Sequence, residues 1–199
     1  MSNFVSRIKD KLHSRYEKYV EDCFEEHKLT RIIDIPGFTG LKPAILYKEE
    51  LEKLFAQHLY TKEYFYYNGY CGCNTLPNIK PEDNYYEYAI IDNDEVVGYI
   101  TYYINVCTDS VERFGLFSFK GFNMVVGAQT RDLLVNLVKT HRRVEWRCVE
   151  GNPASKTYDH FCKRYNGYKG VFHKCLKDDE GNLLDSYTYE ILDHGAPHE

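Results

Sequence analysis

The chain has 199 residues and a formal net charge of -5, with 43% hydrophobic, 28% charged and 16% aromatic residues. This composition is ordinary for a globular domain with a sizeable core, and it excludes a disordered or fibrous chain. The negative charge argues against a nonspecific grip on nucleic acid, whose phosphates require clustered lysines and arginines.

The sequence also argues against a membrane protein. No apolar run approaches the roughly 20 residues that a membrane-spanning helix needs, and the charged N-terminus lacks the apolar stretch of a secretory signal. The seven cysteines show no framework spacing, as expected of free thiols in a reducing compartment. We therefore expect a cytoplasmic protein that binds neither membrane nor nucleic acid.

The N-terminal part of the chain predicts two helices. Residues 4–29 carry apolar side chains at intervals of four, which indicates an amphipathic helix that needs a partner surface. A short β-rich segment follows at residues 30–42, and residues 48–59 predict a second amphipathic helix. We expect residues 1–84 to form these helices and a tyrosine-rich loop, packed on a separate core.

The tyrosine-rich segment, residues 60–86, predicts a lid or a partner surface and contains Cys71 and Cys73. One residue between the two cysteines is tighter spacing than a zinc knuckle uses, and no second pair lies at a matching distance. We therefore expect no metal. Zinc-dependent binding through these thiols stays an alternative that metal analysis of the purified protein would decide.

From residue 85 the patterns become regular. Residues 85–92 and 95–106 predict two strands of a hairpin, because both are rich in tyrosine and β-branched residues and a polar turn separates them. Residues 111–122 predict a third strand. Residues 130–143 predict a helix with one apolar face.

Residues 144–192 predict a strand, a helix and a hairpin. Residues 144–151 predict a fourth strand, and Asn152-Pro153 is a strong helix start, since asparagine accepts from an unbonded N–H and proline has none to lose. Residues 167–192 predict a closing hairpin. We expect the core to span residues 85–192, and residues 193–199 to be a frayed tail.

This order of elements resembles that of the Gcn5-related N-acetyltransferase (GNAT) family. The best local match is Glu150-Gly151-Asn152-Pro153-Ala154, followed by Tyr158 and Gly167-Tyr168, which is similar to the family's asparagine, alanine, helical tyrosine and closing Gly-aromatic pair. The resemblance implies an α+β fold with a mixed, mostly antiparallel sheet flanked by helices, carrying an N-terminal helical extension.

The resemblance also implies a function. It predicts an N-acetyltransferase that uses acetyl-CoA as its co-substrate and moves the acetyl group to a primary amine by direct attack, without a covalent enzyme intermediate. The acceptor would be an amine of a small molecule or a peptide, and the sequence leaves a homodimer open.

Two stretches would hold the coenzyme in this interpretation. The pantetheine arm carries amides that bond to a strand edge as another strand would, and its diphosphate suits free N–H groups at a helix start. The resemblance implies a pantetheine contact with the main chain of Phe117, Ser118 and Phe119. Aligned on Leu133-Leu134, it implies a diphosphate contact with Gly127, Ala128, Gln129 and Thr130, although this run has fewer glycines than the family's loop.

Tyr158 has two interpretations. Tyr158, Phe161, Cys162 and Tyr165 recur at helical spacing and predict one buried stripe, so packing alone explains the tyrosine. The resemblance instead places a tyrosine four residues after the alanine beside the coenzyme sulfur, where a phenol protonates the departing thiolate. Asn152 likewise has two interpretations. It is either a helix cap or a contact to the coenzyme.

A base must take the proton of the attacking amine. Glu112, Glu145 and Glu87 lie on predicted strands and are the candidates, although each is also an ordinary solvated strand residue. Cys148 is better explained as a buried thiol than as a nucleophile, because no histidine pairing is visible.

The second functional hypothesis is a degenerate acyltransferase fold without catalysis. The chain would then be a binding or assembly module, of the kind that a phage or mobile element uses, with the tyrosine-rich segment as its contact surface. Its support is the glycine-poor phosphate loop and the lack of an identified base.

Overall fold

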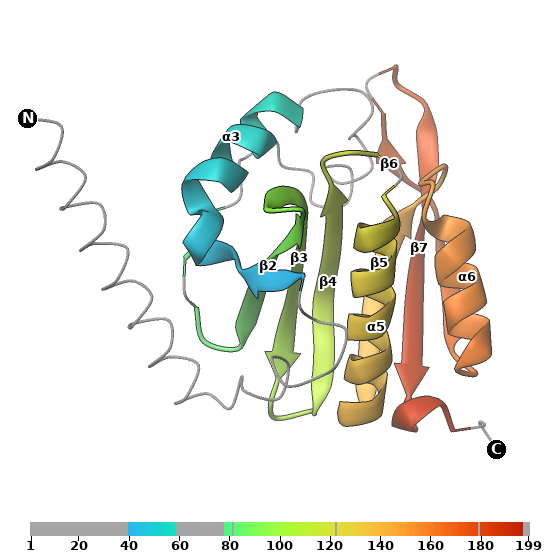
Figure 1. Cartoon of the computed structure of the whole chain (residues 1–199). Helices are drawn as coiled ribbons and strands as arrows, with labels where there is room; N and C mark the ends of the chain where they lie inside the picture. Colours follow the sequence, from blue (N-terminus) through green and yellow to red (C-terminus); the bar gives the residue numbers. More distant parts are fainter. Residues whose placement is uncertain (1–39, 59–77, 81, 122, 179, 197–199) are drawn as a thin grey trace, which may run out of the picture.

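The computed structural model describes residues 40–58, 78–80, 82–121, 123–178 and 180–196. The predicted helix at residues 4–29 and the two cysteines of the tyrosine-rich segment lie outside them. The described residues form a sheet with helices on both faces (Figure 1).

The sheet is mixed and mostly antiparallel, as predicted. Among the described residues it has seven strands in the order β1-β2-β3-β4-β5-β7-β6, and only β4 and β5 are parallel neighbours. Strand β1 joins the sheet by pairing with β2, so this part of the N-terminal region belongs to the same sheet as the core. The strands are β1 (Leu41–Pro43), β2 (Tyr85–Asp92), β3 (Glu95–Asn105), β4 (Ser110–Ser118), β5 (Arg143–Val149), β6 (Tyr168–Lys177) and β7 (Leu183–Leu192).

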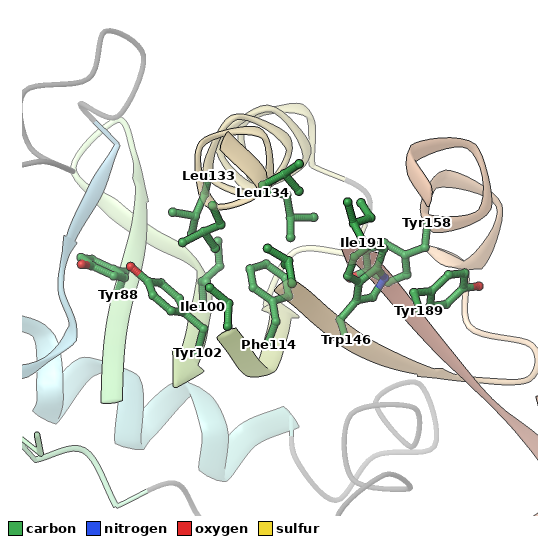
Figure 2. Packing of buried hydrophobic residues seen from close by; sticks show 14 of the residues in the cluster. Tyr88, Ile100, Tyr102, Phe114, Leu133, Leu134, Trp146, Tyr158, Tyr189 and Ile191 are labelled. Atoms are coloured by element: carbon green, nitrogen blue, oxygen red, sulfur yellow. The ribbon is translucent and has the colours of Figure 1, made fainter. Parts of the chain in front are cut away.

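Helices cover the sheet on both faces. Figure 1 shows α5 and α6 side by side over one face, and Figure 2 shows α3 on the other. None of the helices within the described ranges is both long and apolar enough to cross a membrane. The helices are η1 (Ala44–Tyr47), α3 (Lys48–His58), α5 (Met124–Thr140), α6 (Ser155–Arg164) and η3 (Asp193–Gly195).

Two hydrophobic layers follow from this arrangement. The layer under α5 and α6 is the larger, and Figure 2 shows its centre. The layer under α3 is built around Phe55, whose ring meets those of Tyr99 and Phe117 at centroid distances of 5.1 Å. The predicted apolar face of the helix at residues 48–59 is confirmed, since Leu51 and Phe55 are fully buried.

The junction between β4 and α5 differs from the prediction. The strand ends at Ser118 rather than at residue 122, and the helix begins at Met124 rather than at Thr130. The physical reason is a cap: the Asn123 side chain accepts hydrogen bonds from the N–H groups of Val125 at 2.8 Å and Val126 at 3.1 Å. One side chain thereby adds a helical stretch that the apolar pattern did not indicate.

The C-terminal tail also differs from the prediction. Asp193–Gly195 form a short 3-10 helix instead of a frayed end. The Asp193 N–H donates to the Arg142 carbonyl at 2.6 Å, and the Asn166 side chain donates to the Gly195 carbonyl at 2.9 Å. These bonds tie the end of β7 to the start of β5 and the end of α6.

Candidate active site

Strands β4 and β5 are paired over only their first halves. The pairs run from Ser110 with Arg143 to Phe114 with Trp146, and beyond this point the two described strands do not pair. Both strands run in the same direction, so they part towards their C-terminal ends. We call this opening the splay.

A bulge in β4 accounts for the splay. Thr101 and Tyr103 of β3 lie opposite Gly115 and Glu112, so β4 has one residue more than β3 over this stretch. The pairing with β5 shifts at the same place. Arg113, within the bulge, has a left-handed φ of 54°. Such a bulge bends its strand and increases the local twist, which turns the end of β4 away from β5.

The bulge also decides which backbone groups of β4 face the splay. The Phe119 N–H donates to the Val97 carbonyl of β3 at 2.9 Å, so Phe119 points away from the opening. Backbone direction alternates along a strand, so Phe117 also bonds towards β3, while Leu116 and Ser118 turn towards β5. Of the three residues predicted for the pantetheine, Ser118 therefore faces the splay, and Leu116 was missed.

The loop from β4 to α5 lies at the wide end of the splay. Gly121 has a φ of 63°, and an added Cβ there would meet no atom within 4 Å. The predicted phosphate residues Gly127 to Thr130 lie inside α5, and the Gly127 N–H already donates to the Asn123 carbonyl at 3.0 Å. Gly127 is exposed, with open space around it, whereas Thr130 is buried. The backbone N–H of Gly121 is thus more accessible to a phosphate than the backbone N–H groups inside the helix.

Tyr158 lies at the narrow end of the splay. Its side chain is 8% exposed and packs against Trp146, the last paired residue of β5, with ring centroids 5.9 Å apart (Figure 2). Within the described residues its hydroxyl makes no hydrogen bond, and burial raises the pKa of Tyr158 well above 10.0. The phenol therefore keeps its proton at neutral pH, as a proton donor must.

Asn152 stabilises the turn just before α6. Its side-chain oxygen accepts a hydrogen bond from the Ala154 N–H at 2.8 Å, which forms a turn, and the helix begins at Ser155. The predicted use of Asn152 to satisfy a backbone donor is confirmed, although the helix starts later than predicted. The predicted stripe on this helix is also confirmed, since Tyr158 and Cys162 are buried.

A polar contact fixes α6 to the closing hairpin. Asp159, next to Tyr158, accepts hydrogen bonds from Lys169 Nζ and from the Tyr189 hydroxyl, both at 2.7 Å. The Tyr189 ring in turn stacks on Trp146 at 5.3 Å. The strand that borders the splay and the helix that carries Tyr158 are therefore held together through one carboxylate.

This contact makes stability depend on pH. The hydrogen bond from Lys169, followed by that from Tyr189, holds the pKa of Asp159 below its ordinary value of 3.8. A lowered folded-state pKa adds stability above the unfolded pKa, and that stability is lost as the pH falls through the folded-state pKa. Asp159→Asn should therefore unfold at lower urea concentration than the wild type at pH 7, with a difference that shrinks in acid. A difference independent of pH would instead assign the effect to packing.

The two predicted bases on β4 and β5 are already engaged. Glu145 forms an ion pair with Arg143 at 2.6 Å, and Arg143 also pairs with Glu190. Glu112 accepts hydrogen bonds from Ser110 at 2.8 Å and Asn105 at 3.4 Å. Both carboxylates lie on the paired first halves of their strands, before the splay opens.

Glu87 on β2 has a different environment. It is half-buried and accepts hydrogen bonds from the Tyr99 hydroxyl and, at 3.4 Å, from the Lys80 N–H. Burial raises the pKa of Glu87 above 4.5, whereas the hydrogen bond from Tyr99 lowers it. The burial of Glu87 thus works against its charged form.

The thiol of Cys148 agrees with its predicted buried state. Burial raises the pKa of Cys148 to about 12, so it is a protonated thiol and not a nucleophile. All cysteines in the described ranges are free, and no group of ligands there could hold a metal. Cys71 and Cys73 lie outside these ranges.

The sequence has no match among protein-family models or curated proteins. Solved structures do match. An N-acetyltransferase from Staphylococcus aureus Mu50 is 14% identical with a TM-score of 0.55, covering 76% of this chain and 96% of its own. A probable acetyltransferase of the GNAT family from Chromobacterium violaceum is 17% identical with a TM-score of 0.54, covering 81% and 94%.

A third protein, whose acetyltransferase activity is itself an inference, is 20% identical with a TM-score of 0.56, covering 78% of this chain and 86% of its own. At these identities the likeness concerns the fold. The chain is therefore a divergent example of the Gcn5-related N-acetyltransferase fold.

Proposed function

We propose that the chain is an acetyl-CoA-dependent N-acetyltransferase acting on a primary amine. The observation that carries this proposal is the splay beyond Phe114 and Trp146, with a helix start at its wide end and Tyr158 at its narrow end. An extended coenzyme needs this combination of an unpaired strand edge, an open turn for its diphosphate and a proton donor near the sulfur.

The residues present fit the coenzyme in this way. The backbone groups of Leu116 and Ser118 would pair with the pantetheine amides as a neighbouring strand does. The open turn at Gly121 and the positive end of α5 would take the diphosphate, with exposed Gly127 leaving room beside it. Asn152, in the turn before α6, is half-buried and would be a further contact.

The chemistry is a direct transfer. The unprotonated amine attacks the thioester carbonyl, a base takes the proton that the nitrogen loses, and the carbon–sulfur bond breaks as the amide forms. The Tyr158 hydroxyl would then give its proton to the departing thiolate. This step suits Tyr158 because its buried phenol is neutral and forms no hydrogen bond to the described residues.

Binding of the coenzyme tests the proposal. Titration calorimetry should give one acetyl-CoA per chain with micromolar affinity. Adenosine 3′,5′-bisphosphate lacks the pantetheine arm and should bind much more weakly, because it does not reach the β4 edge. Absence of binding at millimolar acetyl-CoA would exclude the enzymatic function.

A binding or assembly module without catalysis is the second candidate. It is favoured by apolar side chains on the β6–β7 hairpin, where Tyr168 is 64%, Phe172 51% and Leu183 56% exposed. It is also favoured by Asn123, whose side chain occupies two of the first amides of α5. This candidate predicts a partner recovered by pull-down and no effect of Tyr158→Phe.

A further inference from the structure

Strand β6 forms one edge of the sheet and is accessible on both of its faces. Within the described residues it pairs with β7 only, and each of its residues is exposed or half-buried. Its first half carries large apolar side chains that are exposed, those of Tyr168, Val171 and Phe172. An edge strand of this kind can pair with a strand of another chain, so this stretch is a candidate interface.

The pairing of the neighbouring strands shows which backbone groups of β6 face the open edge. The Glu150 N–H donates to the Asp185 carbonyl at 2.9 Å in continuation of the β5–β7 register, so the odd-numbered residues of β7 bond towards β5. The even-numbered residues of β7 therefore bond towards β6, where they lie opposite the even-numbered residues of Tyr168–Phe172. The N–H and C=O groups of Lys169 and Val171 consequently point to the open edge.

A bulge ends the regular part of β6 at Phe172. Between Phe172 and Leu176, β6 has more residues than the facing part of β7. Lys174, within this bulge, has a left-handed φ of 51°, and its N–H donates to the Asp185 carboxylate at 2.8 Å. Such a bulge bends the strand, so a partner strand can pair with residues 168–172 but not beyond them.

This short stretch matches a second copy of itself in one register. A twofold axis at Lys169 would place that lysine opposite its own copy, and an axis at Val171 would place Lys169 opposite His173 of the bulge; both bring cations together. An axis at Gly170 places Lys169 opposite Val171 of the second copy. The residues whose backbone groups face the edge then bond to each other in both directions, and no like charges meet.

The same register brings aromatic rings together. With the axis at Gly170, Tyr168 of each copy lies opposite Phe172 of the other in non-hydrogen-bonded pairs, where side chains approach most closely. The glycine leaves room between these rings, and Tyr168 Cε1 already lies 3.5 Å from the position of a Cβ added there. On the other face the Lys169 ammonium donates to Asp159 at 2.7 Å, so the charge that enters the interface is already compensated.

We propose that the chain forms a homodimer in which the β6 strands of two copies pair antiparallel about Gly170 and join two sheets into one. Main-chain hydrogen bonds, aromatic rings and charges all fit this one symmetric arrangement, which assigns the open edge to a second copy. Strand β7 separates β6 from β5, so the homodimer does not depend on the function proposed for the splay.

Sedimentation velocity of the full chain tests the homodimer. The wild type should pass from monomer to dimer at micromolar concentration, as expected of a small interface. Val171→Lys would face Lys169 of the second copy and should raise the dimer dissociation constant about tenfold, whereas Val171→Glu would face it with an opposite charge and should bind about tenfold more tightly than Val171→Lys. Val106→Lys, at an exposed position just after β3, should change nothing.

A proline variant tests the backbone bonds separately. Val171→Pro removes an N–H that points to the edge and not to β7, so it should give a monomer whose circular dichroism matches that of the wild type. A wild type that stays monomeric at every concentration would overturn the inference and leave the edge to another partner. Equal effects of Val171→Lys and Val171→Glu, or a dimer that persists in a folded Val171→Pro, would overturn it as well, because neither agrees with pairing about Gly170.

Discussion

Tyr158→Phe is expected to lower turnover by about 10² to 10⁴-fold, the range attributed to a well-placed general acid. The substitution removes only a hydroxyl that forms no hydrogen bond within the described residues, so the ring packing against Trp146 and Tyr189 stays. Affinity for acetyl-CoA should not change, because the backbone of β4 and the turn before α5 would hold the coenzyme. A fall in kcat at constant dissociation constant is therefore the expected signature.

Steady-state kinetics and calorimetry together decide this prediction. Tyr165→Phe is the matched control, because Tyr165 lies on the same buried stripe of the chain but packs on Phe161, away from Trp146. It should keep full turnover. If Tyr158→Phe also keeps full turnover while the wild type is active, Tyr158 is a packing residue and another group protonates the thiolate.

Gly167→Ala is expected to destabilise the fold by about 2 to 3 kcal/mol, the upper range for overpacking. An added Cβ would lie 2.7 Å from Cys162 Sγ, 2.7 Å from the Glu190 carbonyl oxygen and 2.8 Å from Ile191 Cγ1. The carbonyl belongs to β7 and cannot move aside without breaking the sheet. Gly167 is the turn that brings the chain from α6 back to the sheet, so the strain would reach the helix that carries Tyr158.

Urea unfolding of Gly167→Ala and of a matched glycine variant tests this expectation. Gly127 lies inside α5 with no atom within 4 Å of an added Cβ. Gly127→Ala should therefore stabilise the protein by about 0.5 to 1 kcal/mol through the better helix propensity of alanine. If both variants were equally stable, the close approach at Gly167 would not be a constraint on the fold.

Side-chain patterns were enough to predict most of the fold. The bounds predicted for β2 agree with the structure, and the prediction for β3 differs by one residue, because alternating tyrosines and β-branched residues end at clear turns. The stripe of α6 could be predicted because helical spacing alone places Tyr158 and Cys162 on one face. These features depend on neighbours in the sequence.

The parts that were missed depend on single contacts or on the backbone. The start of α5 is set by the capping bonds of Asn123, although an asparagine before an apolar run was a usable signal. The side of β4 that faces β5 depends on the bulge at Arg113, and arginine is a residue that seldom marks a left-handed conformation. The pairing of Arg143 with Glu190 arises only when β5 and β7 meet.

The bulge at Arg113 has a consequence for how this protein can change. Side chains alternate along a strand, so removing the surplus residue would exchange the faces of everything after it, turning Phe117 towards α5 and Leu116 towards α3. The deletion that closes the sheet would therefore also disrupt both of its hydrophobic layers. Single substitutions can replace the residues that line the splay. The splay itself persists, because losing the bulge that forms it would destabilise the whole fold.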